Sequence, residues 1–363
     1  MRTSEMIELI KKLSLAFGPS GMEDEVRELI LAECKEFSER TTVDELGNIC
    51  IKIECGRHDA PTLMLCAHMD EVGMMITHVE DCGVLRFAEI GGISPSVLSG
   101  KRVMLYGHDK EKLHGVIASK AIHLQSDDER KKHIECDKLY IDVGASTREQ
   151  AEELCSIGDC AVFSSDFERF GDGDAMLKCK ALDDRVGCAI LISILRHLRE
   201  DEPALNCNLA ICFTTREETG LSGAAVAAYN SSPDYAVILE TTTVADLPSV
   251  EEKRRVAKIG GGGVLSLLDR ASIYDRTFLS FVTKLKDLPK FQIKEYFAGG
   301  NDTRHIQLCR DGCHAIALSV PTRYLHSASC VVNIDDVKQT ERLAYRIIRD
   351  FDESAMKMAK GDI

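Results

Sequence analysis

The sequence predicts an α/β fold in which a mixed sheet is flanked by helices and carries a small β-rich insert. Continuously apolar runs such as residues 62–67 alternate with helical patterns near both ends of the chain, which is typical of strands buried on both faces. Between residues 71 and 166, short strand-like runs replace the helical periodicity. Because 363 residues exceed one small core, we expect a main domain from residues 1–70 and 167–363 and an inserted β-rich domain from residues 71–166.

Two helices and three strands are expected before the insert. An apolar stripe predicts a helix over residues 4–16, and the Gly18-Pro19-Ser20-Gly21 segment then breaks the chain. The helical pattern resumes over residues 22–37, where Ser20 and Glu23 have the spacing of a capping box. The strands expected next lie within residues 42–53, around a turn at residues 47–48, and over residues 62–67.

Six strands are expected in the insert, because Gly and Asp clusters separate short runs with little helical periodicity. The charged segment of residues 125–132 predicts an exposed loop or a disordered tip. The six runs cover residues 72–79, 84–90, 102–106, 115–118, 138–143 and 159–163.

The α/β pattern returns after the insert. Candidate functional segments lie where predicted strands give way to loops, which is where open α/β sheets place their ligand sites. Helices are expected over residues 184–198, 222–228, 274–285 and 334–357, and strands over residues 205–214, 235–239, 292–297 and 314–319.

The composition argues against some partners. The chain has 45 Lys and Arg against 59 Asp and Glu, and a net charge of −14 disfavours binding to nucleic acid or to an anionic membrane. No apolar run reaches about 18 residues, and the first residues run into an amphipathic helix rather than a signal peptide. We expect a cytoplasmic protein whose fifteen Cys, an odd number, are mostly free and buried.

Metal-ligand side chains gather at strand ends and at one helix start. Two His and several carboxylates in such places are what a two-metal hydrolase needs. The five segments are Ala67-His68-Met69-Asp70-Glu71, Leu182-Asp183-Asp184-Arg185, Arg216-Glu217-Glu218-Thr219, Leu239-Glu240 and Leu325-His326-Ser327.

His68 and Asp70 are two residues apart after a buried strand, so an extended backbone points both side chains to one side. His68 can then ligate a metal while Asp70 fixes an imidazole or guides a proton. An isolated His is more often satisfied by a nearby backbone group, but the neighbouring carboxylate and Gly73 favour the metal here.

The acidic segments also have ordinary alternatives. Asp183 could be a helix N-cap, yet two consecutive Asp exceed what a cap requires, and a carboxylate can bridge two cations. Glu217 and Glu218 could be a solvated loop pair, or one could take a proton while the other holds a metal. Glu240 follows a buried strand, and His326 supplies a second imidazole.

In combination, these segments resemble the glutamyl aminopeptidase or tetrahedral aminopeptidase family, metallopeptidase family forty-two, whose members are often labelled endoglucanases. The resemblance covers nearly the whole chain. Its motifs are Gly18-Pro19-Ser20-Gly21, Ala67-His68-Met69-Asp70-Glu71-Val72-Gly73, Lys180-Ala181-Leu182-Asp183-Asp184-Arg185, Glu217-Glu218-Thr219-Gly220-Leu221, Gly299-Gly300-Asn301-Asp302 and Pro321-Thr322-Arg323-Tyr324-Leu325-His326-Ser327.

The resemblance implies a dinuclear-metal aminopeptidase that hydrolyses N-terminal residues from peptides. Glu217 would activate a metal-bridging water as general base, Asp70 would orient His68, and Asp183 would bridge the metals. The implied ligand sets are His68, Asp183 and Glu240 for one metal and Asp183, Glu218 and His326 for the other. The two divalent ions per subunit would be zinc, cobalt or manganese.

The resemblance also implies architecture and assembly. We expect a phosphorylase/hydrolase-like mixed sheet of the zinc-peptidase type, with an inserted small β-barrel-like domain that builds a homo-oligomer, a dodecamer assembled from dimers. Two departures stand out. Glu240 replaces the usual Asp and must reach from a backbone set farther back or change its denticity. The segment Gly299-Gly300-Asn301-Asp302-Thr303 replaces Gly-Gly-Thr-Asp-Ala and precedes the bulky Arg304 and His305, so substrate preference is expected to differ.

Two other functions fit the same residues. A deacylase or amidase acting on small N-acylated substrates would need the same water activation, because metal ligands do not report the leaving group. A catalytically decayed assembly protein is the alternative from another class. Glycoside hydrolysis would need two carboxylates about the scissile bond and no metal, so sensitivity to chelation would argue against it.

Overall fold

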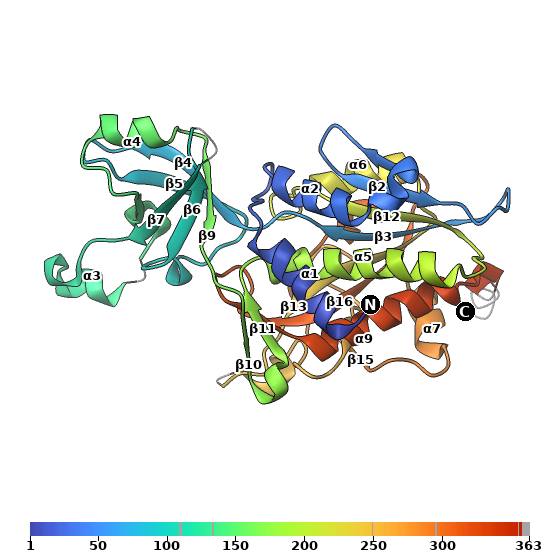
Figure 1. The fold of residues 1–363 in the computed structure, drawn as a ribbon. Coiled ribbons are helices and arrows are strands. Elements are labelled where there is room, and N and C mark those ends of the chain that lie inside the picture. Colours follow the sequence, from blue (N-terminus) through green and yellow to red (C-terminus); the bar gives the residue numbers. More distant parts are fainter. Residues whose placement is uncertain (109–110, 133, 249, 295, 355, 358–363) are drawn as a thin grey trace.

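The computed structural model describes residues 1–363 except 109–110, 133, 249, 295, 355 and 358–363. It contains a large mixed sheet covered by helices and, beside it, a closed barrel of six strands (Figure 1). The expected fold class is confirmed. None of the helices in the described part of the chain combines the length and apolar character that a membrane crossing needs.

The large sheet holds residues from both ends of the chain. Its strands are β1 Thr41–Val43, β2 Ile49–Ile53, β3 Thr62–His68, β10 Glu168–Phe170, β11 Met176–Cys179, β12 Asn208–Thr214, β13 Tyr235–Thr243, β14 Gly263–Leu265, β15 Phe291–Ile293, β16 His314–Arg323 and β17 Cys330–Asn333. Their order is β1-β2-β12-β3-β13-β16-β17-β11-β10, with β14 pairing with β16 and β15.

The centre of the sheet is parallel. Strands β12, β3, β13 and β16 are neighbours in parallel register, so their carboxyl ends meet at one edge. Nearly every residue of β3 and β12 is buried, which explains why these strands are almost continuously apolar. The outer strands β1, β2, β17, β11 and β10 pair antiparallel.

Helices cover this sheet. The long helix α5 packs against β3 and β13, with α1 and α9 against it (Figure 1). The helices of this part are α1 Thr3–Leu15, α2 Asp24–Glu33, α5 Leu182–Asp201, α6 Ser222–Ser231, α7 Arg276–Lys284, α8 Thr303–Ile306 and α9 Ile334–Arg349.

The barrel closes in the order β4-β5-β8-β7-β6-β9 and has an apolar core of its own. A closed barrel leaves no free edge among its strands. Two helices, α3 Asp127–Lys131 and α4 Arg148–Leu154, lie on it. The barrel strands are β4 Gly73–Val79, β5 Leu85–Ile90, β6 Arg102–Tyr106, β7 Lys112–Ala118, β8 Tyr140–Asp142 and β9 Cys160–Phe163.

Some local expectations are wrong. The Ser20 hydroxyl does not cap a helix but donates to Asp70 Oδ2 at 2.5 Å, while the Glu23 carboxylate accepts the N–H groups of Gly21 and Arg216. The expected helix over residues 22–37 ends at Glu33 and continues as a 3₁₀ helix, Lys35–Arg40. The side chains of Ser20 and Glu23 thus contact Asp70 and Arg216 and do not form the local cap that their spacing suggested.

Other elements differ in length. The charged segment near residue 127 forms the short helix α3, and Ser126 and Glu129 form a capping box at its N-terminus. Strand β13 continues four residues past its expected end, so Glu240 lies inside a strand rather than after it. The final helix α9 ends at Arg349, before the expected end at residue 357.

Candidate metal centre

The five candidate segments converge at the carboxyl edge of the parallel strands. His68 is the last residue of β3, and Glu240 lies in the neighbouring strand β13. Glu217 and Glu218 follow β12, and His326 follows β16. Asp183 enters from the start of α5. Five separate segments of the sequence therefore meet in one place, as ligand sites do in open α/β sheets.

The two Asp residues at the start of α5 have different roles. The Asp184 carboxylate accepts the N–H of Gly187 at 3.1 Å, so Asp184, not Asp183, satisfies a free amide of the first turn. Arg185 does not pair with Asp184 but donates to Leu13 O at 2.6 Å. The backbone of Asp183 is non-helical, and the peptide bond between Asp183 and Asp184 is cis.

Asp183 stands between the two imidazoles. His68 Nε2 is 3.3 Å from Asp183 Oδ1, and His326 Nε2 is 3.3 Å from Asp183 Oδ2. His68 Nε2 is also 3.4 Å from Glu240 Oε1, and His326 Nε2 is 3.4 Å from Glu218 Oε2. Each carboxylate oxygen of Asp183 thus lies near one imidazole, and each of these imidazoles lies near one further carboxylate, that of Glu240 or Glu218.

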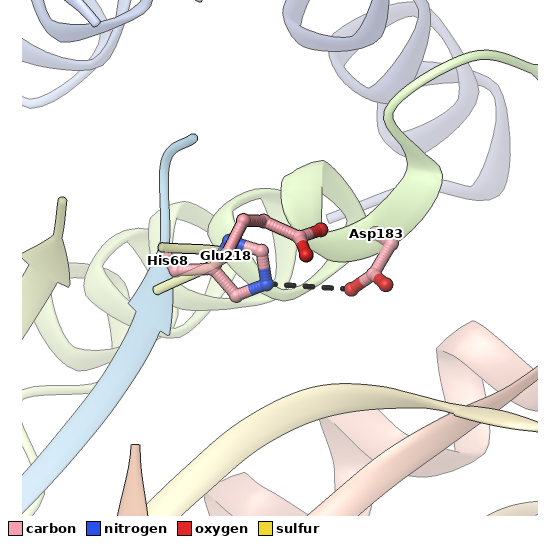
Figure 2. A group of neighbouring side chains, drawn as sticks. All are labelled: His68, Asp183 and Glu218. Atoms are coloured by element: carbon pink, nitrogen blue, oxygen red, sulfur yellow. Dashed lines mark ion pairs between the residues drawn. The ribbon is translucent and has the colours of Figure 1, made fainter. Parts of the chain in front are cut away.

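These spacings fit metal coordination. Metal–ligand distances of about 2.0–2.1 Å in a tetrahedral site place neighbouring ligand atoms about 3.3–3.4 Å apart. Figure 2 shows His68, Asp183 and Glu218, whose ligand atoms all lie within 4.8 Å of one another. In addition, Asp183 Oδ1 and Asp184 Oδ2 are buried without a hydrogen-bond partner among the described residues. A buried carboxylate oxygen needs such a partner or a cation.

Asp70 links several parts of the site. Its two oxygens accept the backbone N–H groups of Glu217 and Glu218 at 3.0 and 3.1 Å. Oδ1 lies 3.3 Å from His68 Nδ1, and Oδ2 accepts the Ser20 hydroxyl. Asp70 is fully buried. Because Nδ1 of His68 faces Asp70, Nε2 is left to face Asp183 and Glu240.

His326 is oriented from the barrel side of the molecule. Its Nδ1 lies 2.8 Å from Gly92 O, in the loop after β5. A proton on Nδ1 would leave Nε2 as the free lone pair that points at Asp183 and Glu218. The loop after β5 therefore takes part in building a site on the neighbouring sheet.

The crowding of acids and imidazoles shifts their protonation. Burial raises the pKa of Glu218 to about 8, and the charge of Asp183 adds to this shift. Burial also raises the pKa of Glu217 well above its usual range. Burial alone would lower the pKa of His326, but Asp183 and Glu218 outweigh it and raise this pKa to about 10. Strongly shifted groups clustered in a cleft are typical of a functional site.

The cluster opens onto a cavity of about 690 Å³, within the usual size of a small-ligand site. Side chains of His68, Asp183, Glu217, Glu218, Glu240 and His326 line it. Other lining residues were not anticipated as site residues, notably Asp269 and Lys294, and Ser94 from the loop after β5. Arg304 also lines the cavity, as the bulky segment after Asp302 suggested. Asp269 and Lys294 do not belong to a recognisable sequence motif, so their place in the cavity is known only from the folded structure.

Comparisons with known proteins agree with this geometry. The family described as M42 glutamyl aminopeptidase matches residues 47–343. A putative aminopeptidase of Acetivibrio thermocellus is 34% identical over 351 residues, covering 96% of this chain and 100% of the relative. A TET aminopeptidase structure from a marine sediment archaeon of the Thaumarchaeota is 30% identical with a TM-score of 0.92, covering 98% of this chain and 99% of that one.

A further solved structure is a dodecamer. It is the TET peptidase of Pyrococcus horikoshii, which is 32% identical with a TM-score of 0.83 and covers 94% of this chain and 98% of that one. The two solved structures thus share the fold over nearly the whole length of this chain. The chain belongs to the M42 glutamyl aminopeptidase family and is a metal-dependent hydrolase that removes N-terminal residues from peptides.

Proposed function

We propose that the chain is an aminopeptidase with two divalent metal ions per subunit, bridged by Asp183. His68 and Glu240 complete one ligand set, and Glu218 and His326 complete the other. The observation that carries this proposal is the two-sided environment of Asp183, whose oxygens each face a different imidazole at 3.3 Å. A mixed His and carboxylate set suits zinc, cobalt or manganese.

Glu217 is the general base of the proposed reaction. When bound, the two ions lower the pKa of a water molecule and polarise the scissile carbonyl. The Glu217 carboxylate lines the same cavity and takes the proton of the attacking water, then returns it to the leaving amine. Burial raises the pKa of Glu217, and a more basic carboxylate is a better acceptor for the proton of the water.

The other residues position these groups. Asp70 fixes the ring of His68 and, through two backbone N–H groups, the adjoining residues Glu217 and Glu218. Glu240 lies inside β13, and its Oε1 also accepts the N–H of Thr241 at 2.9 Å. This bond holds the longer side chain folded back toward His68, which supports Glu240 as a ligand despite its extra methylene.

The test separates metal binding from catalysis. Glu217→Gln should retain both metals but lose at least about 100-fold in kcat, the usual contribution of a general base. Metal content after dialysis and turnover of aminoacyl-p-nitroanilides are measured together, and the exposed Glu8→Gln variant serves as the matched control. Full activity in Glu217→Gln would overturn this assignment. Hydrolysis of N-acetyl amino acids in preference to the anilides would instead favour a deacylase.

We also propose a homo-oligomer, a dodecamer built from dimers, in which residues 71–166 form an inserted oligomerisation domain and residues 1–70 and 167–363 the catalytic domain. The support is the barrel with its own core and the likeness to a dodecameric relative. Light scattering would give the mass. A cytoplasmic location is supported by the fifteen cysteines, all of which are free thiols.

A further inference from the structure

We propose that Cys50 and Cys212 are an oxidative modification site, at which a peroxide converts the two thiols into a disulfide between β2 and β12 and a small thiol reduces it again. Three observations support this inference: the contact between the two sulfurs, the unequal acidity of the two thiols, and the position of Cys50 next to the edge of the sheet. The inference is independent of the proposed function, because neither cysteine is among the described residues that line the cavity at the metal centre.

The two cysteines face each other across an antiparallel pair of strands. Cys50 of β2 is the register partner of Cys212 of β12, and the Cys212 thiol donates to Cys50 Sγ at 3.2 Å. Directly opposite residues of antiparallel strands have Cα atoms about 4.5–5.5 Å apart, which lies within the range that a disulfide spans. The two sulfurs can therefore approach to a bond of about 2.0 Å while the strands keep their register.

The contact makes the two thiols chemically unequal. Because Cys212 donates its S–H, the hydrogen bond stabilises a thiolate on Cys50 and lowers the pKa of the Cys50 thiol despite its burial. The same hydrogen bond, together with burial, raises the pKa of Cys212 well above its usual range. A thiolate is the form that attacks a peroxide, so Cys50 is the residue that reacts first.

The chemistry needs a peroxide and no other reactant. The Cys50 thiolate attacks one oxygen of hydrogen peroxide, the O–O bond breaks, and the departing hydroxide takes up the proton that Cys50 released. The sulfur of Cys212 then attacks the resulting sulfenic acid of Cys50, the S–O bond breaks, and a second water leaves with the proton of Cys212. Two thiols lose two electrons and one peroxide gains them. Two molecules of a small thiol reverse the change and become a disulfide themselves.

A small oxidant can reach Cys50 from the edge of the sheet. Strand β1 is the edge strand, has only three residues, and places Thr42 opposite Cys50. Short edge strands with exposed side chains open locally at a low cost in free energy. Cys50 is itself 6% exposed, whereas Cys212 lies fully buried behind it. The more acidic thiol is thus also the more accessible one.

A second cross-strand pair serves as an internal control. Cys179 of β11 and Cys330 of β17 are also register partners in antiparallel strands. The Cys330 thiol, however, donates to the carbonyl oxygens of Tyr324 and Ser327 at 3.4 and 3.5 Å. Burial raises the pKa of Cys179 to about 11. The register of this pair is the same but its thiols are not activated, so we expect it to stay reduced.

The disulfide would also stabilise the native state. It would join residues that are 162 positions apart in the sequence, and closing so long a loop restricts the unfolded chain. The midpoint of urea denaturation should therefore rise after oxidation and return after reduction. Cys50→Ala should show no rise on oxidation, and a rise in that variant equal to that of the unmodified protein would overturn the assignment to this pair.

The main experiment maps the cross-link in the full-length protein. Hydrogen peroxide is added until the exposed thiol of Cys82 is oxidised, the protein is unfolded, and the remaining thiols are blocked with N-ethylmaleimide. Mass spectrometry of peptides prepared without reductant should find Cys50 joined to Cys212, with a mass two hydrogens below that of the separate peptides. Dithiothreitol should remove this cross-link. Its yield should exceed that of a Cys179–Cys330 cross-link at least about tenfold, because reactivity follows the thiolate fraction.

Two variants test the order of the steps. In Cys212→Ala, the sulfenic acid of Cys50 has no partner, and dimedone should label it. In Cys50→Ala, dimedone should leave Cys212 unlabelled. Cys82→Ser, which removes an exposed thiol, should form the same cross-link as the unmodified protein. Labelling of Cys212 in Cys50→Ala at the level of Cys50 in Cys212→Ala would contradict the assignment of Cys50 as the residue that reacts first.

The unmodified protein alone can overturn the proposal. Oxidised Cys82 beside fully reduced Cys50 and Cys212 would show that the peroxide had acted and had not modified the pair. Equal yields of the two cross-strand disulfides, or a disulfide from Cys50 to a different cysteine, would also contradict it. These results hold even if an alanine variant fails to fold, and they are measured without any assay of peptide hydrolysis.

Discussion

At the residue scale, Asp70 joins three segments of the site: the end of β3, the loop after β12 and the turn that contains Ser20. Asp70→Asn would keep one oxygen that can accept a backbone N–H. Its NH₂ group would face the other N–H, and because NH₂ is a donor it cannot accept that hydrogen bond. The ring of His68 would lose its negatively charged neighbour at Nδ1. Removing such a supporting carboxylate usually lowers metal affinity about 10- to 100-fold.

This loss can be measured by competition with a chromogenic chelator. The control is Asp59→Asn, because Asp59 is exposed and remote from the site. Equal metal affinity in Asp70→Asn and the unmodified protein would show that Asp70 does not orient His68.

The pH dependence of metal binding follows from the same cluster. In the metal-free protein the pKa of His326 is raised to about 10 and that of Glu218 to about 8, so both groups carry protons at pH 7. A metal must displace these protons, and its apparent affinity should therefore rise with pH toward pH 10 and fall with acidification. Calorimetric titrations in two buffers of different ionisation enthalpy would reveal the released protons. Binding without proton release would contradict the proposed ligand set.

Much of the candidate site could be predicted from the sequence because its members stand at strand ends in recognisable segments. His68, Glu217 and His326 are of this kind. The orientation of a side chain is harder: Ser20 and Glu23 have ideal capping spacing, yet both bond to residues that the fold brings near. Lys294 had no local signal at all, because its position depends on the packing of two short strands, β14 and β15.

At the element scale, a buried ion cluster ties three elements together. Lys180 Nζ is 2.6 Å from Glu71 Oε1, and an Arg185 nitrogen is 3.5 Å from the same oxygen. The two cations also donate to Ala16 O and Leu13 O at the end of α1. Glu71 follows β3, and Arg185 lies in the first turns of α5. The cluster therefore holds α1 against the loop that carries Asp70.

Glu71→Gln should destabilise the protein by about 3–5 kcal/mol, because it leaves two buried cations without their anion. The free energy of unfolding is measured by urea denaturation. Glu8→Gln, on an exposed face of α1, should change it by less than about 0.5 kcal/mol. A loss in Glu71→Gln no larger than in this control would mean that the cluster contributes little to stability.

The lengths of elements decide how well they could be predicted. Helices α1 and α5 and strands β3 and β12 have enough apolar periodicity to be recognised. The strands β10, β11, β14 and β17 have only three or four residues each and were missed. Such strands form because neighbouring strands offer them partners, and that information is not local.

At the scale of the whole molecule, the proposed ligands come from segments between residues 68 and 326, so the metals would cross-link the sheet. His68 and Glu240 lie on the adjacent strands β3 and β13, while Asp183 belongs to α5. His326 is also held by the loop after β5. Unfolding separates all of these groups, so the unfolded chain cannot bind the ions as the native state does.

Metal addition should therefore stabilise the native state. One site at a free metal concentration of 100 times Kd adds about 2.7 kcal/mol to the free energy of unfolding. Denaturation of the chelator-treated protein with and without zinc, cobalt or manganese would measure this gain. Asp183→Asn should lose it at both sites, because both proposed sites share this carboxylate, whereas Glu240→Gln should lose it at only one. A gain that survives in Asp183→Asn would place the metals elsewhere, and an equal loss in both variants would mean that the two ions bind only together.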